Sequence, residues 1–422
     1  MTWNPEKRVV ITGIGVLASN GKGREEFWNS LRQGKVGYKP VTIFEPNEIF
    51  DPAQFRVNIA GEIENFDPTI YMGPKGLRSL DRTVKLAVSS ARMVIKDSQF
   101  EINDVTTDDV GISLGCTLGS LKSIADFDYI TLKEGPKYTN PAHFPNTVIN
   151  SPASQICIWN NIQGFCTTIS TGFTAGIDAM SYGFNFLKFG RVKIVYAGGI
   201  EELCQQTFWG MHTLKFLSGS QEGQSFVNCP FDKRRNGVTF GEGACLIAME
   251  DLEHAKKRGI PILAEVLGFG YYFDPFKVHK YNPKGPGVRA AMRAALEDAD
   301  LKPEDIDYIC ANANSHPMAD KVESEAIKDV FGKRAYDIPV SAPKSMFGEC
   351  YSVGGALAAT ACVGAIQGNF IPPTMNYHEK DPACDLDYVP NKSREAKLNK
   401  ILVNTFGPNG SNSSMILGRY EG

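Results

Sequence analysis

The sequence predicts an α/β protein made of two similar halves. Strand-like apolar runs alternate with helix-like stretches along its 422 residues, which is typical of helices layered on a sheet. The succession repeats, so we expect one half over residues 1–255 and a second over 256–422. Each half also holds a segment of small and apolar residues with little charge, AGIDAMSYGFNFLKFGR and GGALAATACVGAIQGNF. Helices of that composition are usually buried on all sides, so these two segments are predicted to be counterparts in the core.

The individual elements follow from local patterns. Short β-branched runs that end at glycines predict strands, and apolar residues at helical spacing predict helices. In the first half the predicted strands are 8–16, 110–115 and 192–197, the predicted helices are 25–33, 81–98, 120–133 and 176–189, and a proline-containing loop covers 138–145. In the second half we expect strands at 262–267, at 308–311 and near the C-terminus, with helices at 286–298, 322–331 and 354–368.

Composition narrows the class of protein. The formal net charge of −3 gives no electrostatic reason to expect nucleic acid or an anionic membrane as a partner. No run approaches the roughly 18 apolar residues of a membrane span, and the N-terminus has no signal-like apolar core. The ten cysteines are scattered without a CxxC pair. We therefore expect a cytoplasmic protein with reduced thiols and no metal site.

The stretch TISTGFTAGIDAM at 168–180 is the first that indicates chemistry. It predicts a strand, a tight turn and a helix, and a side chain at the turn would lie beside the unpaired amides of the helix N-terminus. A cysteine there would have a lowered pKa and act as a nucleophile. The residue at the apex is Phe173, which has no such reactivity. The neighbouring hydroxyls, Ser170, Thr171 and Thr174, are more often caps and turn bonds than nucleophiles.

Five motifs in order resemble the β-ketoacyl synthase family of the thiolase superfamily along nearly the whole chain. They are VITGIGV at 10–16, STGFTAGIDA at 170–179, PFDKRRNGVTFGEGA at 230–244, KSMFGE at 344–349 and NTFGPNG at 404–410. The resemblance implies a thiolase-like five-layered αβαβα fold from two duplicated halves, and a dimer. It implies no bound cofactor, since an acyl carrier protein supplies the phosphopantetheine arm.

Active members of the family use a cysteine and two histidines, and this chain has lost all three. The cysteine of STGCTSG is Phe173, the histidine of NAHG falls on Asn314 and the histidine of KSMxGH falls on Glu349. His316 lies close enough to Asn314 in the sequence to be considered as a substitute. A histidine beside a proline in a loop is more often structural.

The residues around the lost site still match the family. Lys344, Asp320 and Glu323 match positions that form an ion-pair network under the active site, and we expect them to hold two loops together through buried paired charges. Phe406 matches the phenylalanine of the gating loop. The family pattern GFGG has become FGPNG here, so Pro408 should stiffen that loop.

Loss of the reactive groups within an intact frame resembles the chain length factor, or ketosynthase β subunit, of type II polyketide synthases. That resemblance implies a heterodimer with an active ketosynthase α subunit, and a channel that sets the length of a polyketide intermediate, aromatic or polyene, held on an acyl carrier protein. Chain length factors often carry glutamine at the cysteine position, so Phe173 is a departure. The predicted dimer interface includes strand residues 166–171 and the helix at 120–133.

The family's length-setting positions fall on that helix. Matching backward from the Glu134-Gly135-Pro136 turn places them at Leu121, Ile124 and Asp128, whose i, i+3, i+7 spacing gives one helical face. An unpaired buried carboxylate is costly, so either Phe127 takes the place of Asp128 or the channel is wet there. The plainer alternative is that Leu121 and Ile124 are ordinary core residues.

Two other functions stay open from the sequence. The chain could be an active β-ketoacyl-ACP synthase with a relocated nucleophile, Cys350 first and Cys166 second. Glu349 next to Cys350 would raise the pKa of that thiol and work against this. The chain could also be a homodimeric acyl-binding protein without a catalytic partner.

Overall fold

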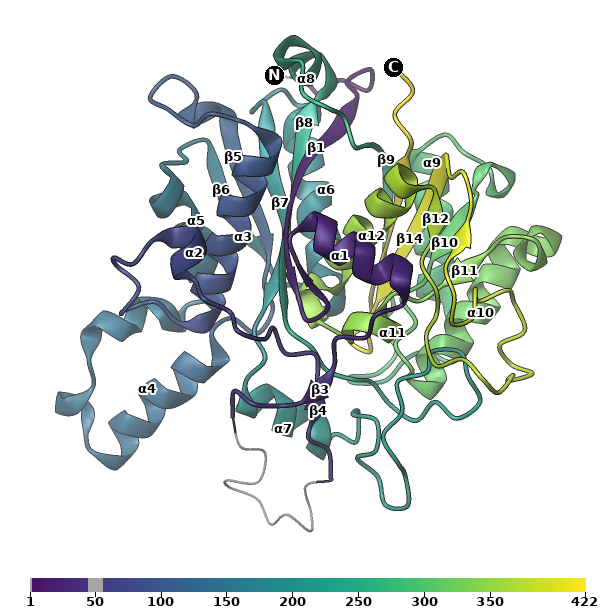
Figure 1. Cartoon of the computed structure of the whole chain (residues 1–422), viewed down its shortest axis with the longest axis horizontal. Coiled ribbons are helices and arrows are strands. Elements are labelled where there is room, and N and C mark those ends of the chain that lie inside the picture. The colour runs from purple at the N-terminus through teal and green to yellow at the C-terminus, as the bar shows by residue number, and fades with distance from the viewer. Residues whose placement is uncertain (1, 45–55) are drawn as a thin grey trace.

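The computed structural model describes residues 2–44 and 56–422 (Figure 1), and its strands form two groups with the same topology. In chain order the first group is β1 (Val9–Ala18), β5 (Val110–Gly115), β6 (Phe165–Ile169), β7 (Ile194–Glu201) and β8 (Gly243–Asp251). The second group is β9 (Ala264–Phe273), β10 (Tyr308–Cys310), β11 (Val340–Ser341), β14 (Lys400–Phe406) and β15 (Ser411–Gly418).

The spatial order within each group reveals the duplication. The strands lie as β1-β8-β7-β5-β6 and as β9-β15-β14-β10-β11, which in both groups is first, fifth, fourth, second, third. The directions agree as well. In each group the second strand is parallel to the third and fourth, and the fifth is antiparallel to its neighbours. The prediction of two similar α/β halves is therefore confirmed at the level of topology.

Strand β1 joins the two groups into one sheet. It pairs with β8 over its whole length and with β9 only at Val9, Val10 and Ile11. The register with β8 shifts between Ile11 and Gly13, where β1 bends away from β9. Beyond this point the two half-sheets diverge and leave room for helices between them (Figure 1).

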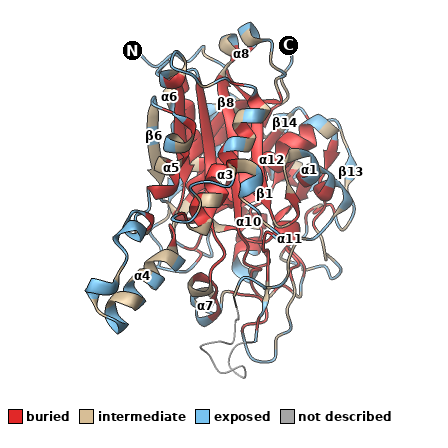
Figure 2. Ribbon diagram, turned by 60° about the vertical axis from the view of Figure 1, so that its left-hand side comes forward, coloured by how far each residue is buried: buried red, intermediate tan, exposed pale blue. Residues whose placement is uncertain are grey.

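Helices fill three layers around the two half-sheets. α6 (Ala175–Lys188) and α12 (Gly354–Gly368) lie between them, and their buried side chains share one apolar cluster with strands of both halves. α3 (Arg82–Ser98) and α5 (Ser151–Asn160) pack on the outer face of the first half-sheet. α9 (Pro286–Asp298) and α10 (Pro317–Phe331) pack on the outer face of the second. The result is the expected αβαβα fold, with its buried strands and central helices at the core in Figure 2.

Most element boundaries lie close to the sequence predictions. The two central helices are buried along their length, as predicted, and α9 and α12 have the predicted bounds. α3 begins one residue late because Asp81 caps it, accepting a hydrogen bond from the Val84 amide.

Four of the predictions differ more clearly from the structure. β9 extends to Phe273, six residues past its predicted end at 267. α10 starts at Pro317 rather than 322, since His316 caps it. The predicted loop at 138–145 instead contains two short 3₁₀ helices, η2 (Pro136–Tyr138) and η3 (Pro141–Thr147). Strand β7 extends to Glu201, four residues past its predicted end, through two glycines that approach neighbouring backbone closely.

Other elements decorate this core. The helix α1 (Arg24–Gln33) packs against α12, α4 (Leu121–Lys133) projects from the first half, and α7 (Gln205–Thr213), α8 (Leu252–Arg258) and α11 (Lys344–Phe347) are short (Figure 1). No helix within the described ranges is long and apolar enough to cross a membrane. All ten cysteines are free, and all but Cys157 and Cys166 are buried.

Candidate functional site

Phe173 lies at the turn between β6 and α6, where the sequence predicts a nucleophile position. The turn is the 3₁₀ helix η4 (Gly172–Thr174), and Gly172 adopts φ +77, which favours glycine. The Phe173 ring is only 2% exposed. Its centroid lies 4.3 Å from the ring of Tyr351 and 6.2 Å from that of Phe216. The position that could present a thiol to an acyl group is thus occupied by a packed aromatic ring.

Asn314 and Glu349, which the sequence analysis matched to the family's two histidines, bond directly to each other. The Asn314 Nδ2 donates to Glu349 Oε2 at 2.8 Å, and the same oxygen accepts from Lys344 Nζ at 2.8 Å. The other carboxylate oxygen accepts from the Tyr351 amide at 3.1 Å. All three polar side chains are at most 2% exposed. Asn314, Glu349 and Lys344 therefore satisfy one another's hydrogen-bonding groups inside the protein.

The predicted network under the site is continuous, but most of its links are hydrogen bonds. Lys344 pairs with Glu349, and not with Asp320 or Glu323 as expected. Its Nζ also donates to Asn312 Oδ1 at 2.7 Å, and the backbone amide of Asn312 donates to Glu323. Backbone amides donate to both acidic groups, and the cation beside Asp320 is Arg235, whose Nε lies 3.9 Å from Asp320 Oδ2, and not Lys344.

Asp320 and Glu323 are buried, and burial raises the pKa of each carboxyl. Burial raises the pKa of Glu323 to about 7, although the amides of Asn312 and Ala313 and the side chain of Asn404 donate to it. Burial also raises the pKa of Asp320 to about 6, against the opposing effects of Arg235 and of backbone amides. Both residues fix the loop at 312–315 to α10, which is a structural role.

His316 caps α10 and is not placed as a replacement base. Its Nδ1 accepts hydrogen bonds from the amides of Met318 at 3.2 Å and Ala319 at 3.4 Å. Its ring packs between Phe216 and Tyr281, at 5.1 Å and 4.9 Å between centroids. Burial, reinforced by Arg235, lowers the pKa of His316 to about 4. The ring is therefore neutral near pH 7 and its capping nitrogen is occupied.

The loop that matches the family's gate is tied to the Phe173 turn. Phe406 ends β14 and is buried against Tyr281, with ring centroids 5.9 Å apart. Asn409 Nδ2 donates to the carbonyl of Thr171 at 2.9 Å, and Thr405 Oγ1 donates to the carbonyl of Phe173 at 3.0 Å. These bonds close the loop over the turn.

The two candidate relocated thiols have opposite surroundings. Cys350 is fully buried, its sulfur lies near backbone carbonyls, and burial raises its pKa well above the usual range. Cys166 is exposed on β6, and a hydrogen bond from Cys157 lowers its pKa. Neither thiol lies at the Phe173 turn.

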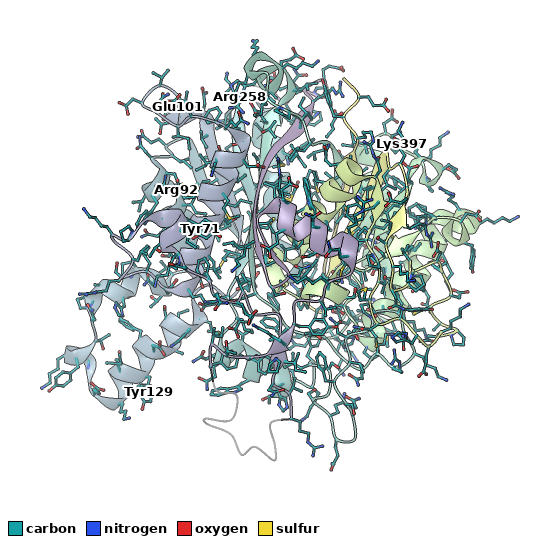
Figure 3. All side chains as sticks on the ribbon, viewed as in Figure 1. Tyr71, Arg92, Glu101, Tyr129, Arg258 and Lys397 are labelled. Carbon is teal, nitrogen blue, oxygen red and sulfur yellow. The ribbon has the colours of Figure 1, made fainter. Side chains whose placement is uncertain are left out.

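The four residues named for the channel lie on α4, which has no fully buried residue in this chain. Leu121, Ile124 and Phe127 are half-buried, and Asp128 is exposed. Phe127 packs on Phe144 with ring centroids 6.2 Å apart. Figure 3 shows Tyr129 at the outer part of the helix, away from the body of the chain. The packing of this helix is incomplete unless another surface covers it.

Two acidic residues that the sequence analysis missed anchor α4. Glu201 ends β7 and Glu202 follows it. Glu201 accepts a hydrogen bond from the amide of Leu118, just before α4, at 3.2 Å, and Glu202 accepts one from the amide of Lys122 in α4 at 3.3 Å. Burial raises the pKa of Glu201 to about 7 and that of Glu202 to about 8. A Glu-Glu pair after a buried strand is the signal that could have drawn attention to them. Tyr351 and Phe216, which pack on Phe173, carry no such signal.

Two family models match this chain, one over its first part and one over its second. The model described as "Beta-ketoacyl synthase, N-terminal domain" matches residues 6–255, and "Beta-ketoacyl synthase, C-terminal domain" matches residues 263–378. The chain belongs to the β-ketoacyl synthase family. Among the described residues, no group of three or more His, Cys, Asp or Glu side chains is placed to hold a metal ion.

Similar curated proteins include 3-oxoacyl-[acyl-carrier-protein] synthases and a polyketide synthase subunit. A 3-oxoacyl-[acyl-carrier-protein] synthase 2 of Coxiella burnetii is 35% identical over 98% of this chain and 99% of that protein. The tetracenomycin polyketide synthase ketoacyl synthase alpha subunit of Streptomyces glaucescens is also 35% identical, over 99% of each.

Solved structures extend the similarity to three dimensions. A structure described as the ishigamide ketosynthase/chain length factor has a TM-score of 0.91 and 34% identity, covering 98% of this chain and all of that one. A second is AntDE:AntF, a type II PKS acyl-carrier protein in complex with its ketosynthase bound to the hexaketide. It has a TM-score of 0.89 and 28% identity over 98% of this chain and all of that one.

Proposed function

We propose that this chain is a chain length factor. In this role it makes no acyl-enzyme of its own, pairs with an active ketosynthase α subunit, and forms one wall of a channel that limits a growing polyketide. The intermediate stays on an acyl carrier protein, whose phosphopantetheine arm is the group that carries it. The observation that carries the proposal is the packed state of the degenerate site, where Phe173 fills the nucleophile position and Glu349 is held by Lys344 and Asn314.

Two incompletely covered surfaces of the first half favour the presence of a partner subunit. β6 is the last strand of the sheet and pairs on one side only, with β5, so its other edge offers free backbone groups in the described chain. α4 projects from the same half, with half-buried apolar residues and an exposed tip (Figure 1). A homologous subunit that paired with β6 would cover both surfaces, which fits the ketosynthase/chain length factor similarity.

An active synthase with a relocated thiol is the second candidate. Its strongest candidate nucleophile, Cys350, is enclosed among carbonyls with a raised pKa, and both features disfavour the thiolate that would attack a thioester. Cys166 has the lower pKa but lies on an edge strand away from the degenerate site.

Intact-protein mass spectrometry tests the proposal directly. The pure chain is incubated with an acyl carrier protein that bears a short acyl thioester, alongside Cys350→Ala and Cys166→Ala variants. We expect no acyl adduct on any of the three. An adduct that disappears in one of the variants would instead establish an enzyme with a relocated nucleophile.

Co-purification separates the proposal from a homodimeric acyl-binding protein. The chain is expressed alone and together with a ketosynthase α subunit encoded in the same genome. We expect poor recovery alone and a one-to-one complex on co-expression. A stable homodimer that ignores the α subunit would favour the acyl-binding protein.

A further inference from the structure

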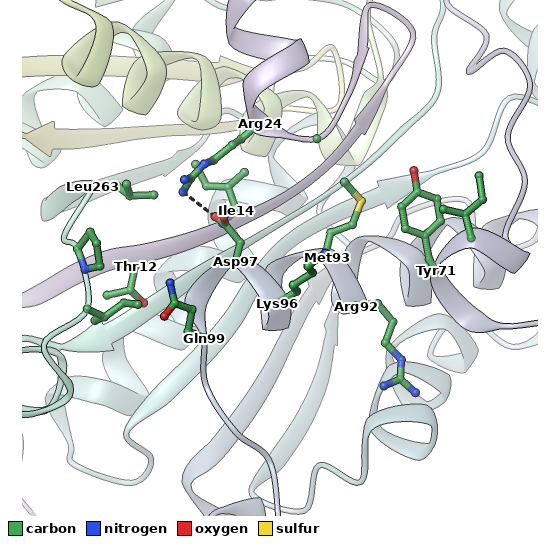
Figure 4. Close-up of a pocket in the computed structure, with 14 residues that line it drawn as sticks. Thr12, Ile14, Arg24, Tyr71, Arg92, Met93, Lys96, Asp97, Gln99 and Leu263 are labelled. Atoms are coloured by element: carbon green, nitrogen blue, oxygen red, sulfur yellow. Dashed lines mark hydrogen bonds and ion pairs between the residues drawn. The ribbon is translucent and has the colours of Figure 1, made fainter.

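A groove of about 610 Å³ lies where the two matched domains meet, apart from the degenerate site. Its lining comes from β1, α3, the start of α1, α2 (Thr69–Met72) and the connection at 260–263 (Figure 4). The groove forms because β1 bends away from β9 at the register shift between Ile11 and Gly13. Its volume falls within the range of small-molecule sites, which often lie at domain junctions.

The apolar part of the lining is drawn from three separate elements. Ile14 of β1 and Leu263 of the connection are buried, and Met93 of α3 is half-buried. Figure 4 shows Ile14 between the other two. Ile260 and Pro261 continue this surface toward solvent. The groove therefore offers a continuous apolar surface to a chain-like ligand.

The charged part of the lining is unbalanced. It contains three cations, Arg24, Arg92 and Lys96, and one carboxylate, Asp97. Asp97 already accepts from Arg24 Nη1 at 2.9 Å and from the Ile14 amide at 2.8 Å, and Glu25 holds Arg24 from outside the groove. The charges of Arg24 and Asp97 thus cancel, and two cations remain.

Arg92 and Lys96 differ in whether their charged groups already have a partner within the protein. Arg92 Nη2 donates to the Trp159 carbonyl at 2.6 Å, which directs it toward α5. Lys96 is exposed, and its ammonium makes no hydrogen bond or ion pair with the described residues. Figure 4 shows Arg24 on the α1 side of the groove and Lys96 on the α3 side. One free ammonium beside an apolar surface is complementary to a singly charged amphiphile.

We propose that this groove binds a medium-chain alkyl carboxylate, with the carboxylate on Lys96 and the chain along Met93, Ile14 and Leu263. The lining shares no residue with the Phe173 turn or with the rings packed on it, so such a ligand would act on the connection between the two domains rather than on the channel. The proposal does not depend on the chain length factor function.

Methyl-labelled methionine NMR of the full chain tests the site, because the Met93 methyl lines the groove. Octanoate is the probe, octan-1-ol is the neutral match, and butyrate and hexanoate are shorter acids. We expect octanoate to shift the Met93 methyl saturably while Met318, on the far side of the second half, does not move. Affinity should rise by up to roughly fourfold for each added methylene that enters the groove.

The charge contact is tested with Lys96→Glu against Lys397→Glu, an exposed lysine outside the groove (Figure 3). Lys96→Glu should weaken octanoate binding at least tenfold and leave octan-1-ol unchanged, and Lys397→Glu should change neither. A Met93 shift that never saturates would overturn the site. Equal effects of the two variants would overturn the carboxylate assignment.

Discussion

Glu349, which the sequence analysis matched to a catalytic histidine of the family, is part of the structural frame. It satisfies Lys344, Asn314 and the Tyr351 amide at once, inside a region with almost no solvent contact. A buried ion pair of this kind adds little net stability compared with apolar residues, but breaking it is costly because one charge stays unpaired. Phe173 contributes in a different way, through about 1.5–3 kcal/mol of apolar burial.

Glu349→Ala should lower the free energy of unfolding by about 3–5 kcal/mol, because Lys344 would remain buried without its partner. The double variant Glu349→Ala with Lys344→Met should recover most of that loss. Chemical denaturation of the two variants and the parent measures both values. Equal stability of the single and double variants would contradict the pairing.

Glu202 should make stability depend on pH. Burial, with Asp81 nearby, raises its folded pKa to about 8 from the usual 4.5, so the folded state keeps a proton that the unfolded state releases. The contribution is fully present below pH 4.5 and is lost as pH rises toward 8. Glu202→Gln should therefore match the parent near pH 4.5 and exceed it by about 1–3 kcal/mol at pH 8.

The measurement is a set of denaturant titrations between pH 5 and 8. Glu253→Gln is the matched control, since that side chain is 72% exposed. A constant difference between Glu202→Gln and the parent at every pH would show that the carboxyl does not titrate in this interval.

At the scale of elements, β6 and α4 are the parts of the first half that a single chain leaves incomplete. β6 lies at the sheet edge with half-exposed side chains, and α4 has no buried residue. An uncovered strand edge is a common route to pairing with another chain. We therefore expect a partner subunit to cover both β6 and α4.

Ile169→Asp should abolish co-purification with the ketosynthase α subunit, because it places a charge on the β6 edge where strands of the two subunits would meet. Val105→Asp is the control, since Val105 is 87% exposed and far along the sequence from β6. Size-exclusion chromatography of the co-expressed proteins gives the result. Retention of the complex by Ile169→Asp would remove β6 from the interface.

Leu121→Ala or Ile124→Ala should lengthen the polyketide product, because a smaller side chain deepens a channel that ends at α4. Leu132→Ala on the same helix is the control, as Leu132 is 86% exposed at its outer end. Mass spectrometry of products from the reconstituted complex measures chain length. An unchanged product distribution in both variants would exclude α4 as the channel wall.

At the scale of the whole molecule, the central layer makes the two halves interdependent. α6 comes from the first half and α12 from the second, and one apolar cluster contains both helices together with strands of each half-sheet. Neither half can bury its inner sheet face without the other. We therefore expect the two halves to fold as one unit.

Residues 1–255 and 256–422 expressed separately should fail to fold, because each fragment exposes the α6–α12 side of its sheet. Mixing them during refolding should restore structure. Circular dichroism and NMR dispersion report on each fragment and on the mixture. A well-dispersed spectrum from either fragment alone would show that its half is an independent domain.

The sequence by itself determined the α/β class and the two-half organisation, and it is the basis for the prediction that three reactive groups are lost. Each of these is carried by local patterns, such as the buried character of 354–368 or the presence of Phe173 at a strand-to-helix turn. The same patterns located most helices and strands to within a few residues. They could not give the bounds of α10, which depend on the capping geometry of His316.

Tertiary structure alone decided which groups meet. Lys344 bonds to Glu349 and Asn312 rather than to Asp320. Asn312 follows β10 and Glu349 follows α11, and the fold brings both side chains to Lys344, whereas the backbone amide of Asn314 donates to the Asp320 carboxylate. The junction groove is likewise lined by residues near 12, 93 and 263. They are too far apart in the chain to form a recognisable sequence motif. Contacts between distant segments depend on how layers pack, and no short stretch of sequence encodes that packing.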